Sequence, residues 1–120
     1  MGLDMYLSRV VNEKRVIVIQ WRKVNCIHAF FERELKTEIE NCEDYKISVE
    51  VLKKLQETIQ LVLNDNLLAS THLPTQQGFF FGSLEYDEWY FDDLKWTKQT
   101  LDTLLKNCEE EETFIYHAWW

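Results

Sequence analysis

The feature that most constrains the fold is an abrupt change of hydrophobic period near residue 21. Residues 15–21, RVIVIQW, are rich in β-branched side chains and almost continuously apolar, which is typical of a buried strand. Residues 22–40 instead repeat apolar side chains at helical spacing, and these are Val24, Ile27, Phe31 and Leu35. A short chain that combines both periods is predicted to pack helices against a sheet.

The flanking segments extend this prediction. Residues 3–10 are expected to form a first strand, and a turn at residues 12–14 joins it to the second strand as a hairpin. A polar break is expected at residues 41–45. A second helix then follows, capped by Ser48 and ending near residues 64–66.

The second half of the chain contains one more helix and one more strand. Residues 67–85 are expected to be a loop with a short strand at 79–81, before a helix at 87–108 and a last strand at 113–120. We therefore predict a single α+β domain over residues 1–120. In it, a small antiparallel sheet of about three strands packs against about three helices.

Composition narrows the classes of function. The net charge of −8 disfavours direct binding to nucleic acid, because phosphate neutralisation needs a basic surface. That charge either keeps the protein in solution or presents a negative surface to a basic partner. No apolar run approaches the roughly 20 residues of a membrane span, and no secretory signal is visible. The three cysteines lack Cys-x-x-Cys spacing, so we expect reduced thiols in the cytoplasm and no zinc site.

The first candidate site is the stretch WRKVNCIH at residues 21–28, where a strand gives way to a helix. Unpaired N–H groups at a helix start favour anions, and two basic side chains add positive charge there. The members expected to contact a ligand are Trp21, Arg22, Lys23, Asn25 and His28. The alternative is that the basic side chains only pair with surface carboxylates and that the histidine is structural.

The second candidate site lies in residues 73–91, which hold the only proline and two of the three glycines. Aromatic rings there could stack on a flat group, while hydroxyl and carboxylate groups could hydrogen-bond to it. The members expected to contact a ligand are Phe79, Phe81, Ser83, Tyr86, Asp87 and Trp89. The alternative is a turn and a helix cap whose aromatic residues fill the core. We expect both candidate sites to share one cleft.

Three segments together resemble a family of small bacteriophage and prophage proteins. They are MGLDMY at the start, WRKxNxIH at residues 21–28 and LPTxxGFFFGSxxYDxWY at residues 73–90. The resemblance spans nearly the whole chain. It implies a phage origin and action in the cytoplasm of the bacterial host, and it transfers no catalytic residue.

The sequence thus predicts a phage accessory protein that counters a bacterial defence system by binding, without catalysis, a cofactor or a metal. The expected partner is a small, anionic, nucleotide-like ligand. The alternative is an acidic inhibitor that docks on the basic nucleic-acid-binding surface of a host defence protein. A third reading is a nucleotide hydrolase that uses Asp87 or Glu85. Whether the chain forms a homo-oligomer stays open.

Overall fold

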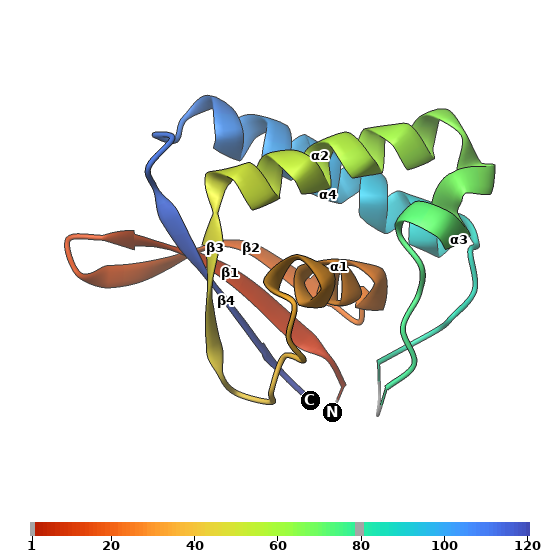
Figure 1. The fold of residues 1–120 in the computed structure, drawn as a ribbon, viewed down its shortest axis with the longest axis horizontal. Coiled ribbons are helices and arrows are strands. Elements are labelled where there is room, and N and C mark those ends of the chain that lie inside the picture. Colours follow the sequence, from red (N-terminus) through yellow and green to blue (C-terminus); the bar gives the residue numbers. More distant parts are fainter. Residues whose placement is uncertain (1, 79–80) are drawn as a thin grey trace.

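The protein folds as one sheet with helices packed on it, as seen in a computed structural model that describes residues 2–78 and 81–120 (Figure 1). The antiparallel strands are β1 (Asp4–Val11), β2 (Lys14–Arg22), β3 (Asp44–Ser48) and β4 (Thr113–Trp119), in the spatial order β2-β1-β4-β3. The helices are α1 (Asn25–Leu35), α2 (Val49–Asn64), α3 (Ala69–His72) and α4 (Glu88–Lys106), with a 3-10 turn η1 (Asn66–Leu68). The predicted α+β class is confirmed, with four strands in the described residues instead of about three.

The hairpin of β1 and β2 forms as the sequence predicts. Asn12 and Glu13 both have positive φ angles, 51° and 67°, which suit the tight turns that match the twist of two antiparallel strands. The pairing slips between Leu7 and Ser8, so that Val18 is an extra residue in β2. Along its other edge, β1 pairs with β4, so β1 lies between β2 and β4 in the sheet.

Helix α1 is shorter than the predicted helix at residues 22–40. Its start is delayed because Lys23 has a φ of 58° and donates its N–H to the carbonyl oxygen of Leu3 at 2.7 Å. Its end comes early because Lys36 takes the left-handed conformation and donates to the carbonyl oxygen of Glu32. The next residues turn back, and Ile39 donates its N–H to the Glu32 carboxylate at 2.7 Å.

Strand β3 begins inside the segment that was predicted to be a polar break. Only Ile47 is buried in it, so its own sequence carries little hydrophobic pattern. The strand is fixed by its neighbour, since all five of its residues pair with β4. Cys42 also donates its N–H to the carbonyl oxygen of Ala118 at 2.9 Å. This strand is defined by tertiary pairing more than by local propensity.

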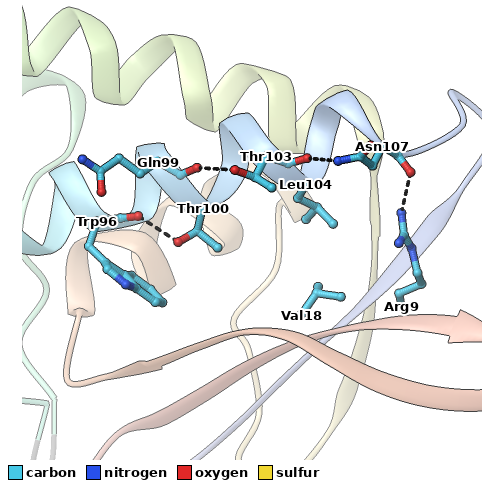
Figure 2. Close-up of a pocket in the computed structure, with 8 residues that line it drawn as sticks. All are labelled: Arg9, Val18, Trp96, Gln99, Thr100, Thr103, Leu104 and Asn107. Carbon is cyan, nitrogen blue, oxygen red and sulfur yellow. Dashed lines mark hydrogen bonds between the residues drawn. The ribbon is translucent and has the colours of Figure 1, made fainter.

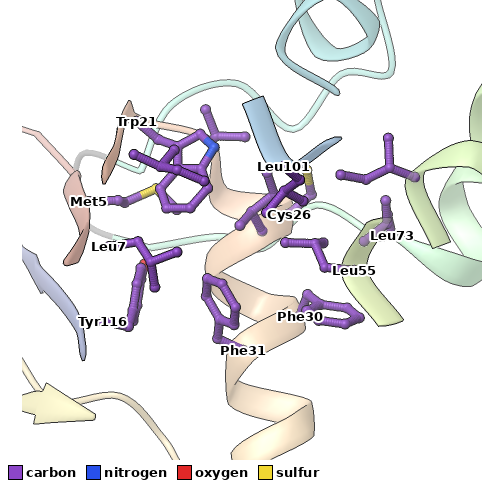
Figure 3. Packing of buried hydrophobic residues seen from close by; sticks show 14 of the residues in the cluster. Met5, Leu7, Trp21, Cys26, Phe30, Phe31, Leu55, Leu73, Leu101 and Tyr116 are labelled. Atoms are coloured by element: carbon purple, nitrogen blue, oxygen red, sulfur yellow. The ribbon is translucent and has the colours of Figure 1, made fainter. Parts of the chain in front are cut away.

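Helix α2 begins after its predicted cap Ser48, and α4 begins at Glu88, one residue after the predicted start at 87. The Ser48 hydroxyl accepts from Val51 N at 3.3 Å to start α2, and the Asp87 carboxylate accepts from Tyr90 N at 3.1 Å to start α4. One face of α4 is buried against α2, the sheet and α1. Figure 3 shows the centre of this core, where side chains of α1 lie between Leu7 on the sheet side and Leu55 on the helix side.

The segment predicted as a loop, residues 67–85, contains α3 and the end of η1. Phe81 is not part of a strand, so the predicted short strand at 79–81 is wrong at that residue. Residues 79 and 80 lie outside the described residues. The rest of the segment runs past the start of α1, and this route places it against the end of β2 (Figure 1).

Candidate functional site

One cleft, of about 190 Å³, joins residues from both segments that the sequence singles out. Three stretches of chain form it: the turn between β2 and α1, the loop before α4, and the first turns of α4. Its lining residues are Arg22, Lys23, Val24, Asn25, Cys26, Thr75, Gly82, Ser83, Glu85, Asp87, Trp89, Tyr90 and Asp93. Six of the predicted ligand-binding residues are among them: Arg22, Lys23, Asn25, Ser83, Asp87 and Trp89.

The first wall of the cleft is basic. Arg22 ends β2 and its Nε lies 3.9 Å from the Asp4 carboxylate, a loose ion pair. Lys23 follows at the turn, and its side chain has no hydrogen bond or ion pair within the described part of the chain. The N-cap of α1 is Val24, which supplies no side-chain hydrogen bond, and the first turn of α1 has no acidic residue. This helix end therefore keeps its partial positive charge, which favours an anion.

Asn25 holds the loop against this wall. Its Nδ2 donates to the carbonyl oxygens of Phe81 at 3.1 Å and Ser83 at 3.0 Å. Its Oδ1 accepts from Gln76 N at 2.9 Å. The amide is buried and both of its polar atoms are bonded within the protein. Asn25 therefore holds the loop in place, whereas the sequence predicted that it would contact a ligand directly.

Gly82 allows the loop to come close to the basic turn. A Cβ added at Gly82 would lie 2.9 Å from Cβ of Lys23, and the φ of Gly82 is +95°. Both the space and the backbone conformation therefore require glycine here. This requirement gives a physical reason for one of the glycines that bracket the aromatic segment.

The opposite wall of the cleft is acidic. It carries the carboxylates of Glu85, Asp87 and Asp93. Desolvation raises the pKa of Asp93, and the negative charges of Asp92 and Asp87 raise it further. Asp93 forms no ion pair within residues 2–78 and 81–120. A hydrogen-bond donor or a cation on a ligand would therefore stabilise its ionised form.

Trp89 lies at the cleft with 71% of its surface exposed, the largest exposed fraction of the five tryptophans. The next residue, Tyr90, is buried and donates its hydroxyl to the carbonyl oxygen of Leu73 at 2.7 Å. The helix start is therefore anchored while the indole of Trp89 faces solvent. An exposed indole can stack on a planar ligand.

Sequence reasoning missed Asp93 and Thr75. A signal for Asp93 was present, because residues four apart lie on the same side of a helix and Asp93 follows Trp89 by four. No comparable signal marks Thr75. It reaches the cleft because its N–H donates to the Tyr86 hydroxyl at 3.1 Å and its hydroxyl donates to the carbonyl oxygen of Leu84 at 3.0 Å.

Four predicted site residues lie outside this cleft. Trp21 is buried and donates its Nε1–H to the Thr97 hydroxyl at 2.9 Å, so it belongs to the core. The hydroxyl of Tyr86 accepts a hydrogen bond from the N–H of Thr75 and so stabilises the loop. His28 and Phe81 line a separate pocket of about 260 Å³. Phe79, the remaining one, lies outside the described residues.

The prediction that His28 shares the cleft with the basic residues is wrong. The ring is 1% exposed, and Nδ1 lies 2.7 Å from the Tyr116 hydroxyl. Its ring packs edge-on against Phe81 and Trp120, at centroid distances of 5.3 and 5.6 Å. Burial lowers the pKa of His28 to about 4, so the imidazole is neutral at pH 7 and offers no charge to an anion.

The cleft has the chemistry of binding more than that of a nucleophilic enzyme. Cys26 borders it, but burial and the nearby charge of Asp93 raise the pKa of the thiol to about 12. It is therefore a thiol at neutral pH, whereas the thiolate is the reactive form. Asp87 already uses one carboxylate oxygen as the cap of α4. Opposed charges and an exposed aromatic ring suit recognition of a polar, planar ligand.

Comparison of the chain with protein-family models, curated proteins and solved structures finds no match. In residues 2–78 and 81–120, no group of three or more His, Cys, Asp or Glu side chains is placed to hold a metal ion. None of the helices in the same residues is both long and apolar enough to span a membrane.

Proposed function

We propose that the protein is a non-catalytic binding protein that captures a small nucleotide-like ligand in the cleft between the β2–α1 turn and the start of α4. One observation carries the proposal. Two segments about 60 residues apart in sequence supply a basic wall and an acidic wall to the same cleft, with an exposed indole beside them. A nucleotide has a matching distribution of groups, since its phosphate is anionic and its base is flat.

The anionic group of the ligand belongs at the basic wall. The Lys23 ammonium and the Arg22 guanidinium are both exposed there, next to the start of α1. A charge-assisted hydrogen bond to a phosphate or carboxylate is worth about 1.5–3 kcal/mol. The backbone N–H groups at the start of α1 add to the attraction for an anion.

The acidic wall restricts which base the ligand can carry. Carboxylates accept hydrogen bonds, and a base with an exocyclic amine donates them, as cytosine does to Asp or Glu. Asp93 and Glu85 would therefore favour adenine, cytosine or guanine over uracil, which has no exocyclic amine. Trp89 would stack on the base. Ligand pockets usually exceed 300 Å³, so the cleft encloses only part of such a ligand.

The biological part of the proposal rests on the resemblance to bacteriophage proteins. Capture of a signalling nucleotide in the host cytoplasm would remove the signal of a bacterial defence system. The test is the plating efficiency of a defence-sensitive phage on cells that express either the natural protein or a Lys23→Gln variant. Rescue by the natural protein alone supports the proposal, and equal rescue by both proteins contradicts capture at this cleft.

A second candidate is an acidic surface that blocks a basic host protein. The run Glu109–Glu112 is its clearest part, and Glu110 has 89% of its side chain exposed. Glu112, in contrast, pairs with Arg9 at 2.9 Å and accepts from the backbone of Glu109. A clean test therefore changes only residues 109, 110 and 111 to glutamine. Loss of activity in that variant, with the Lys23→Gln variant active, would favour this candidate.

The binding experiment is calorimetric titration with adenosine, cytidine and uridine monophosphates. Lys23→Gln should weaken binding of the first two about tenfold or more, from the contact energy above. Lys36→Gln is a matched control, because Lys36 has the same left-handed backbone, with φ of 56°, and lies at the other end of α1. Release of phosphate during the titration would instead identify the hydrolase reading with Asp87 or Glu85.

A further inference from the structure

Strand β2 forms an open edge of the sheet. No other strand of the described residues pairs with its second side. Lys23 donates to the carbonyl oxygen of Leu3, and directly bonded pairs alternate with unbonded pairs along an antiparallel ladder. Gln20, which faces Tyr6 in an unbonded pair, therefore directs its backbone N–H and C=O groups away from β1. Such an edge is a template for an additional strand.

A groove of about 550 Å³ runs between this part of the sheet and α4, and Figure 2 shows the side chains that line it. Trp96, which is 47% exposed, stands at one end, while Leu104 and Val18 provide apolar surface. The hydroxyls of Thr100 and Thr103 donate to carbonyl oxygens of their own helix, at 2.9 and 3.3 Å. Their lone pairs remain to accept hydrogen bonds. The groove thus offers apolar contact and acceptors beside an open backbone edge.

The charge of β2 indicates the kind of strand that would fit. The segment from Lys14 to Lys23 contains no acidic residue, although the protein has a net charge of −8. It has a basic residue at each end and an apolar centre in which Val16 and Ile17 are 50% and 55% exposed. Two of its cations, Arg15 and Arg22, pair with acidic residues at 2.6 and 3.9 Å. Lys14 and Lys23 form no ion pair within residues 2–78 and 81–120.

A second copy of β2 is a poor occupant of this edge. Antiparallel pairing centred on Val18 would place Lys14 of one copy opposite Arg22 of the other, and like charges that face each other across strands destabilise the pair. A strand with acidic ends would instead place opposite charges together. The charge pattern therefore favours a different protein over a second copy of this chain.

We propose that the β2 edge and the groove beside α4 bind an extended peptide segment of a partner protein, with an apolar centre and acidic residues at both ends. The segment adds to the sheet as a fifth strand through the backbone groups of Gln20 at the open edge of β2. Alternate side chains of an added strand point to one face. These side chains enter the groove and contact Trp96 and Leu104. The groove shares no lining residue with the nucleotide cleft, although the basic end of β2 at Lys23 also borders that cleft.

The test uses two labelled synthetic peptides with the same Val-Thr-Val-Thr-Val centre. One has two glutamates at each end and the other has two lysines. Fluorescence anisotropy should show the glutamate peptide binding at least tenfold more tightly to the natural protein. Binding should also weaken as salt rises, because the end charges are exposed. Equal affinity for both peptides, or no binding of the glutamate peptide at millimolar concentration, overturns the proposal.

Two variants separate strand addition from loose adhesion. Gln20→Pro removes a backbone donor that points away from β1, and edge strands tolerate proline. Thr103→Trp fills the groove from an exposed helix position, so the fold persists even if the proline variant misfolds. Each variant that folds should weaken the glutamate peptide about tenfold, and amide exchange at Gln20 should slow when the peptide binds to the natural protein. Unchanged affinity in a folded Thr103→Trp protein, or a protein dimer that Gln20→Pro abolishes, contradicts a partner strand. Nucleotide titration of Thr103→Trp should be unaffected, which keeps the two proposals distinguishable.

Discussion

The buried pair of His28 and Tyr116 makes stability depend on pH in a defined window. The imidazole lies in a pocket of aromatic rings, and its Nδ1 is 2.7 Å from the Tyr116 hydroxyl. Burial is the main cause that lowers its pKa to about 4, and the negative charge of Glu32 opposes that shift only in part. The folded protein therefore keeps this histidine neutral down to acidic pH.

The sign follows from proton binding in the two states. An unfolded histidine has a pKa of about 6.5, so between pH 6.5 and 4 the unfolded state binds more protons at this site than the folded state. Stability from His28 is thus present above pH 6.5 and is lost as the pH falls through the folded pKa. A folded pKa of about 4 against an unfolded pKa of about 6.5 corresponds to about 3 kcal/mol at full protonation, and most of it is lost between pH 7 and pH 4.5.

The measurement is urea unfolding of the natural protein and of His28→Gln at pH 7 and pH 4.5, followed by tryptophan fluorescence. The variant should be less stable at pH 7, since a buried hydrogen bond and packing are disturbed. On acidification, the free energy of unfolding of the variant should fall by about 2 kcal/mol less than that of the natural protein. His72→Gln is the control for the replacement of a histidine, because His72 is exposed. Equal pH dependence in all three proteins would show that His28 does not titrate as its burial requires.

Three further predictions concern residues around the cleft. Asn25→Ala should lower the free energy of unfolding by about 2–4 kcal/mol, because it leaves the buried Phe81 carbonyl and the Gln76 N–H without their partners, and amide exchange at Gln76 should accelerate. Asp93→Asn should raise the melting temperature at pH 7, since the raised folded pKa makes ionisation of Asp93 destabilising; the gain should vanish below about pH 4, where the carboxyl is neutral in both states. In the native protein at pH 7.5, iodoacetamide should modify the exposed Cys42 and spare the buried Cys26 until urea is added, as mass spectrometry of digested samples would reveal.

The strongly patterned parts of the fold could be predicted from the sequence. The hairpin, α2 and α4 each carry a hydrophobic period or a capping side chain, and the structure shows them within two residues of the expected bounds. Strand β3 could not be predicted, because only Ile47 is buried in it and its pairing with β4 decides its conformation. The early end of α1 depends on the left-handed conformation of Lys36, which its sequence does not announce.

The candidate site was predictable in position more than in detail. The basic pair at the end of β2 and the polar residues before α4 do lie around one cleft. The sequence does not reveal that the polar atoms of Asn25 are bonded to the loop, or that His28 faces Tyr116 across the core. These hydrogen-bond partners are set by contacts between distant parts of the chain, which the local sequence pattern does not specify.

The most direct test of ligand capture is a calorimetric titration of the natural protein and its Lys23→Gln and Lys36→Gln variants with cytidine and uridine monophosphates. The proposed cleft predicts measurable binding of the cytidine nucleotide, weaker binding of the uridine nucleotide, and an affinity about tenfold lower in Lys23→Gln alone. Equal affinity for both nucleotides would show that the carboxylates of the acidic wall do not select the base. Equal affinity of the two variants would contradict capture at this cleft.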